Sequence, residues 1–282
     1  MSTPAVEALA IIGAGIAAGT INTVVGSGTL ITFPTLIGFG FPPVLANVSN
    51  NVGLVPGTLS GIYGYREELV GQRARVLRLG SASLLGGLVG AILLLVLPQS
   101  AFKAIVPALI AIALIMVIAQ PALARWVAAR QQARNARRAS ALVPAGRGPE
   151  GDADPGAGTS AQAELQIGGP VVWVLVFLMG IYGGYFGAAQ GILLLGLLGI
   201  TFSDGLQRIN AVKNVLACAV NAVAAVVFIA ATHIDWLVAA LIAAGSIIGG
   251  QIGARAGRKL PPWGLRAIIV CVGVAALIRL LA

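Results

Sequence analysis

The sequence predicts an all-α polytopic membrane protein, and three observations carry this prediction. Of the 282 residues, 58% are hydrophobic and only 10% are charged, whereas a soluble domain carries about 25% charged residues. The apolar runs are long and unbroken, unlike the alternating strands of a membrane β-barrel, so helices must satisfy the backbone in lipid. The third observation is an internal repeat, because the second half of the chain resembles the first.

The repeat has a register that can be read from residues 28–53 and 191–216, which align without a gap. An Asn-x-x-x-Asn pair occurs at the same place in both. An amide inside an apolar segment is costly unless it has partners. Duplicated apolar halves with polar, glycine-broken segments are typical of secondary transporters. The aligned pairs are Gly28 with Gly191, Phe39 with Phe202, Asn47 with Asn210, and Asn51 with Asn214.

Each half offers five apolar segments, and the third to fifth are long enough to cross a bilayer. The second segment of each half is too short, so the first two segments form a broken or re-entrant unit. We therefore expect two homologous repeats, each with a Gly-broken first unit followed by three spans, and about eight full transmembrane helices in all. The segments of the first half are 8–25, 28–41, 43–65, 79–97 and 103–124. Those of the second half are 169–189, 191–203, 207–231, 236–254 and 264–281.

The two predicted breaks, at residues 24–28 and 187–191, are candidate anion sites. Glycine lets the backbone leave the helix, and a helix N-terminus offers free N–H groups to an oxyanion. The alternative is close helix packing through small residues. The polar or glycine residues that could contact a solute here are Gly26, Ser27, Gly28 and Gln190.

Helix starts and domain limits follow from local signals. Pro42 and Pro43 precede the Asn47 helix, and Ser203 and Asp204 are good N-cap residues for the Asn210 helix. The sequence divides into a first transmembrane repeat (1–124), a basic, flexible cytoplasmic linker (125–166) and a second repeat (167–282).

The distribution of basic residues predicts the orientation of the repeats. The formal net charge is +9, and its arginines and lysines lie mainly between apolar runs, as the positive-inside rule expects, which argues against nucleic-acid binding. The basic loop lies between the third and fourth segments in the first half but between the fourth and fifth segments in the second half. This difference favours inverted repeats with both termini outside. Eight spans in parallel repeats, with both termini inside, is the competing arrangement. The basic segments are 66–78, 125–138 and 255–266.

Two polar stripes, one in each half, are the remaining candidates for a solute site. Asn210, Lys213 and Asn214 share one helix face, and Asn47, Asn50 and Asn51 occupy the matching places in the first half. The amides could line a transport pathway or join helices by hydrogen bonds. Lys213 could contact an anion, or could reach toward the membrane interface as Arg208 is expected to do.

Chemistry of other kinds has weak support. Cys218 and Cys271 stand alone in apolar runs, and the single His233 cannot build a conventional metal site. No Walker motif, Ser/His/Asp set or paired carboxylates occur in the chain. We expect no catalytic residue, cofactor or metal.

At these residues the chain resembles the TauE/SafE family of sulfite and organosulfonate exporters. The matching stretches are GIAAGTINTVVGSGTLITFPTL, its repeat GIYGGYFGAAQGILLLGLLG, and the last two spans with GGQIGARAGRK. The run of glycines usual in the family is thinned to Gly26-Ser27-Gly28, and the linker is long and basic. The resemblance implies transport of small sulfur-containing anions.

The sequence therefore predicts a multi-pass transporter of the bacterial inner membrane that moves small anions by alternating access. The rival predictions are an anion channel and an intramembrane sulfur-transfer enzyme that uses Cys218. Protons as the coupling ion, the direction of transport and a homo-oligomeric state stay open.

Overall fold

The computed structural model describes residues 4–142, 168–256 and 262–281, and in these ranges the regular structure is helical throughout. The prediction of an all-α polytopic fold is confirmed. The first half contains α1 (Pro4–Val24), α2 (Thr29–Gly38), α3 (Pro43–Gly64), the 3₁₀ turn η1 (Glu67–Leu69), α4 (Arg73–Val96) and α5 (Gln99–Leu142). The second half contains α7 (Pro170–Tyr185), α8 (Gln190–Thr201), α9 (Leu206–Ala231), α10 (Trp236–Ala256) and α11 (Pro262–Leu281).

Within the described ranges, five helices are long and apolar enough to cross a membrane, namely α1, α4, α5, α9 and α10. The helices α3 and α11 reach spanning length as well, with 22 and 20 residues. The shorter apolar helices are α2, α7 and α8. The chain is thus a multi-pass membrane protein.

The first helix break, at residues 25–28, lies where it was predicted, but the second, at residues 186–189, begins and ends before the predicted 187–191. The chain leaves the helix after Val24 in the first half and after Tyr185 in the second. The α8 helix has 12 residues and α2 has 10. The ungapped alignment therefore holds for the starts of α3 and α9, but it is wrong by two residues at the starts of α2 and α8.

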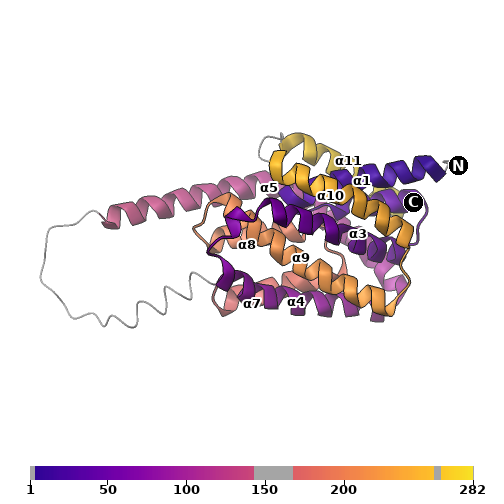
Figure 1. Cartoon of the computed structure of the whole chain (residues 1–282), viewed down its shortest axis with the longest axis horizontal. Coiled ribbons are helices and arrows are strands. Elements are labelled where there is room, and N and C mark those ends of the chain that lie inside the picture. The colour runs from indigo at the N-terminus through magenta and orange to yellow at the C-terminus, as the bar shows by residue number, and fades with distance from the viewer. Residues whose placement is uncertain (1–3, 143–167, 257–261, 282) are drawn as a thin grey trace, which may run out of the picture.

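The helices form two groups, and each group mixes both halves of the sequence. In the first group, α1 and α3 pack on α10, and α2 packs on α11. In the second group, α7 and α9 pack on α4, and α8 packs on α5. Contacts of α3 with α9 and of α5 with α11 join the groups. Figure 1 shows α1, α10 and α11 along the upper edge and α4 and α7 along the lower edge, with α3 and α9 between.

The helices α3 and α9 run in opposite directions. The amide of Gln72, in the connector that follows α3, donates to the carbonyl of Arg208 at the start of α9. At the other end, the N–H of Asp235, just beyond α9, donates to Ser49 Oγ near the start of α3. Both termini lie at one end of the bundle, and α5 extends beyond the opposite end (Figure 1).

Two local predictions differ from the structure. The α5 helix continues to Leu142, so the first part of the predicted linker is helical, and residues 143–166 of the linker lie outside the described residues. Helix α3 begins at Pro43, in agreement with the start predicted from Pro42 and Pro43, but the N-cap of α9 is Gly205, without a side-chain cap hydrogen bond. The cap prediction for Ser203 and Asp204 is wrong, because Asp204 lies one residue too early and binds two arginines instead.

Candidate functional site

The two helix breaks cross each other at the interface of the two helix groups. The backbone N–H of Gly191 donates to the carbonyl of Gly26, with an N···O distance of 3.1 Å. A Cβ added to either glycine would collide with the backbone of the other. Gly26 also has a φ of +90°, which an L side chain rarely adopts. The crossing therefore brings the N-terminal ends of α2 and α8 close together.

Four predicted site residues, Gly26, Ser27, Gly28 and Gln190, gather at this crossing. Gly28 is the N-cap of α2 and Gln190 is the first residue of α8. The side chains of Ser27 and Gln190 are 1% and 3% exposed. Ser27 Oγ and Gln190 Nε2 have no hydrogen-bond partner among the described residues. Buried polar groups nearly always have partners, so the two unpartnered donors are exceptions to the rule.

The broken end of α1 receives three predicted site residues of α9. Lys213 Nζ donates to the carbonyls of Asn22 and Thr23 at 3.1 and 3.3 Å. The amides of Asn210 and Asn214 donate to the Thr23 carbonyl at 3.1 and 3.2 Å. The last carbonyls of a helix lack intrahelical partners, so α9 supplies the donors that this interrupted helix needs.

Lys213 is 0% exposed, so its ammonium is enclosed by the protein and does not extend to the protein surface. Its positive charge lies at the carbonyl end of a helix, where the helix dipole favours a cation. Arg208 does lie nearer the surface, with a side chain that is 39% exposed.

The broken end of α7 has a reciprocal contact from α3. Asn47 Nδ2 donates to the Tyr185 carbonyl at 3.1 Å. Aromatic rings surround this end: the Phe33 and Phe186 centroids lie 5.3 Å apart, edge to face, and Phe102 lies 5.8 Å from Tyr185. Each sequence half thus supports the broken helix of the other.

Asn50 and Asn51 lie one turn after Asn47 on α3. The Oδ1 atoms of both residues are buried without a partner in the described part of the chain. Asn51 Nδ2 donates to Asn221 Oδ1 of α9 at 3.4 Å, so α3 and α9 make a polar contact there.

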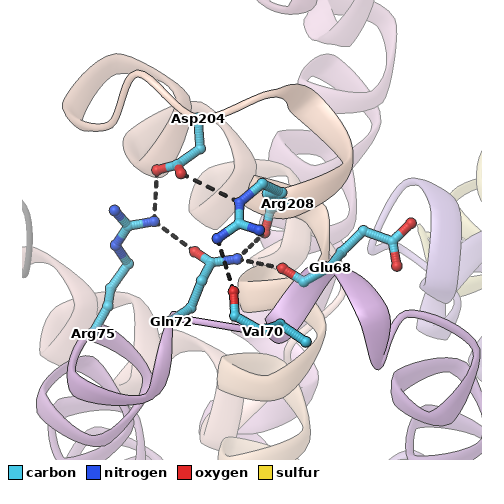
Figure 2. Close-up of polar contacts among 6 residues, drawn as sticks. All are labelled: Glu68, Val70, Gln72, Arg75, Asp204 and Arg208. Carbon is cyan, nitrogen blue, oxygen red and sulfur yellow. Dashed lines mark hydrogen bonds and ion pairs between the residues drawn. The ribbon is translucent and has the colours of Figure 1, made fainter.

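A polar cluster joins the α3–α4 connector to the start of α9, and sequence reasoning missed it (Figure 2). Asp204 accepts from Arg75 at 2.7 Å and from Arg208 at 3.4 Å. Gln72, only 3% exposed, accepts from Arg75 at 2.6 Å and donates to the carbonyls of Glu68 and Arg208. Arg75 and Asp204 are 129 positions apart, so only the basic character of the loop was visible in the sequence. Arg208 also donates to the Val70 carbonyl, and we call these six residues the connector cluster.

The two cysteines, which were considered for sulfur chemistry, are not linked to each other. Cys218 is a free, buried thiol on α9, and Cys271 is free and exposed on α11. Within the described ranges, no group of three or more His, Cys, Asp or Glu side chains could hold a metal ion.

A bundle of apolar helices with two crossed, broken helices and buried polar groups at the crossing defines a polytopic membrane transporter. The family model described as "Sulfite exporter TauE/SafE" matches residues 11–280, and the chain belongs to this family. A relative from Sinorhizobium sp, described as "Probable membrane transporter protein ORF9", is 26% identical over 269 residues, which cover 94% of this chain and 88% of the relative. No solved structure matches the chain.

Proposed function

We propose that this transporter moves small sulfur-containing oxyanions, such as sulfite or organosulfonates, across the inner membrane by alternating access. The observation that carries the proposal is the crossing of the two breaks, where the N-terminal ends of α2 and α8 meet beside two unpartnered donors. Helix N-termini favour anions through their dipoles. The family membership supports the choice of sulfur oxyanions.

In this proposal Ser27 Oγ and Gln190 Nε2 donate hydrogen bonds to the anion, together with backbone N–H groups near Gly26 and Gly28. The asparagines at the helix ends hold the two broken helices in place. Lys213 contributes positive charge near the site while its ammonium is hydrogen-bonded to the end of α1.

The packing suggests how access could alternate. The N-terminus of α2 belongs to the first helix group and that of α8 to the second. An anion between them would therefore lie at the boundary of the two groups. Rocking of one group against the other, about the α3–α9 contact, would open the anion site first to one side and then to the other.

We propose inverted repeats, with the basic connectors inside and both termini outside. The antiparallel course of α3 and α9 supports this topology, and the shared end of the two termini is compatible with it. A periplasm-active phosphatase fused after Ala282 should be active, and green fluorescent protein at the same place should be dark. A bright fluorescent fusion with an inactive phosphatase fusion would contradict the topology.

The experiment for function is flux in proteoliposomes that contain the purified chain. We expect saturable uptake of labelled sulfite or sulfoacetate that is accelerated by unlabelled anion on the opposite side. Thiosulfate and taurine test how far the specificity extends. Ohmic single-channel currents without counter-transport would instead identify an anion channel. Activity abolished by Cys218→Ser, with sulfur bound covalently to the wild-type thiol, would identify the sulfur-transfer enzyme.

Variants link that flux to the crossing. Ser27→Ala and Gln190→Ala should each raise the half-saturating anion concentration roughly ten-fold, since a hydrogen bond to a charged group is worth about 1.5–3 kcal/mol. Gln251→Ala is the matched control, because Gln251 contacts Ser60 within the first group, away from the crossing. Equal effects of all three substitutions would remove the crossing from the anion site.

A further inference from the structure

The carbonyl end of α1 is built like a cation site. Helix α1 stops at Val24, so its last carbonyls point out of the helix with the negative end of the helix dipole behind them. Broken helices in secondary transporters use such carbonyl ends to coordinate small cations. The Asn22 and Thr23 carbonyls provide two of the oxygens.

The Asn210 amide adjoins the Thr23 carbonyl. Asn210 donates its amide N–H to the Thr23 carbonyl, while its Oδ1 is buried and has no partner in the described part of the chain. Carbonyl and amide oxygens are the ligands preferred by hard cations.

Lys213 places its ammonium against the two backbone carbonyl oxygens. Nζ lies 3.1 Å from the Asn22 oxygen and 3.3 Å from the Thr23 oxygen, and the side chain is 0% exposed. None of the ion pairs formed among the described residues includes Lys213. An uncompensated charge in this position would be costly, so the carbonyl dipoles are the groups that stabilise it.

The other half of the molecule has no such charge. The residue equivalent to Lys213 is Asn50, and α7 ends among aromatic rings with a single amide donor from Asn47. The cation is thus specific to the end of α1.

We propose that the end of α1 is a binding site for a small monovalent cation and that Lys213 fills this site as a tethered ion. The wild-type protein then has no need of sodium at this place. Removal of the side chain should leave a carbonyl-lined site that accepts a free cation. The proposal deepens the proposed function by naming what stabilises the broken helix beside the anion site.

The test measures the unfolding temperature of purified Lys213→Ala by tryptophan fluorescence in choline, sodium, lithium and potassium chlorides at equal ionic strength. We expect this variant to unfold at a lower temperature than wild type in choline. Sodium or lithium should raise its unfolding temperature by several degrees in a saturable manner, because ligands that bind only the folded state stabilise it. Butylammonium, which replaces the lost side chain, should act in the same way.

Controls keep the result specific. The wild type and Lys103→Ala, which lacks an exposed lysine of α5, should show no difference between the four salts. If Lys213→Ala cannot be purified, Lys213→Asn introduces the residue of the other half and should show the same cation dependence. An unfolding temperature of the variant that is the same in all four salts would overturn the proposal, as would an equal response of the wild type.

A transport readout complements the binding readout. In proteoliposomes, anion flux by Lys213→Ala should be lost in choline and recover at least several-fold in sodium or lithium, whereas wild-type flux should not depend on the cation. Because the unfolding measurement requires no substrate, a cation effect without any anion flux would sustain the cation site and contradict the proposed function. Anion flux without a cation effect would do the reverse.

Discussion

The broken ends of α1 and α7 have similar backbones but opposite surroundings. Both helices stop before a glycine with positive φ, Gly26 or Gly187, and both offer a carbonyl to an asparagine of the other half. The end of α1 is held by polar groups, including the buried Lys213. The end of α7 is held by the rings of Phe33 and Phe102.

The two halves therefore share the crossing but differ in the side chains that hold the broken helix ends. A charged support depends on electrostatics in a low-dielectric site, whereas an aromatic support depends on packing. Substitutions at the two ends should therefore lower the stability of the protein through different interactions. The following predictions run from the largest expected effect to the smallest.

The feature shared by both ends should be the most sensitive. Gly26→Ala should abolish folding or transport, because the new Cβ would collide with the backbone of Gly191 and the φ of +90° is unfavourable for alanine. Gly40→Ala is the matched control, since Gly40 has a φ of +92° and no atom near an added Cβ. The yield of monodisperse protein and the anion flux measure both variants. Equal losses would attribute the effect to backbone strain and not to the crossing.

The aromatic support predicts a loss of stability without a salt response. Phe102 is 1% exposed and Phe102→Ala should cost about 3–5 kcal/mol. The unfolding temperature should fall by the same amount in choline and in sodium chloride. A sodium-dependent recovery in this variant would show that the two ends do not differ as described.

The asparagines that hold the helix ends should matter more than one that does not. Asn47→Ala and Asn210→Ala should each cost about 1–2 kcal/mol and reduce anion flux, because each leaves a helix-end carbonyl with one donor fewer. Asn221→Ala is the control, since Asn221 contacts the side chain of Asn51, at 3.4 Å, and not a helix-end carbonyl. If the three variants are tolerated equally, the asparagines serve only to join helices by hydrogen bonds.

The connector cluster should give the smallest effect. Asp204→Asn removes the charge that pairs with Arg75 and Arg208 but keeps the shape of the side chain. We expect a loss of about 1 kcal/mol, since the group is partly exposed to solvent. The difference from wild type should shrink as salt is added, because salt screens exposed charges. Unfolding temperatures at low and high salt measure this, and a salt-independent difference would contradict the ionic role.

Much of the candidate site could be foreseen because its signals are local. The glycine-broken segments predicted the breaks, and the repeated Asn-x-x-x-Asn spacing predicted that one helix face in each half would be polar. The structure indeed buries Asn47 and Asn210 at the breaks. The anion-binding roles of these residues stay predictions that the flux experiments test.

The partners of these residues could not be foreseen. Lys213 has its acceptor 191 positions away, and its neighbours in sequence offered only an anion or the membrane interface as alternatives. The cap predicted for Asp204 failed for the same reason, since the competing arginine comes from α4. An ion pair with a residue far away in the sequence thus outweighs the local N-cap preference of an aspartate.

The sequence alone determined that the chain spans a membrane with helices, where those helices break, and which family it belongs to. Hydropathy and glycine placement act over a few residues, so they can be read without the fold. Only the tertiary structure decided that each helix group mixes both halves, that the two breaks touch, and that a lysine completes an interrupted helix. These contacts join segments far apart in the chain, and long-range packing selects them from many arrangements that the local signals allow equally.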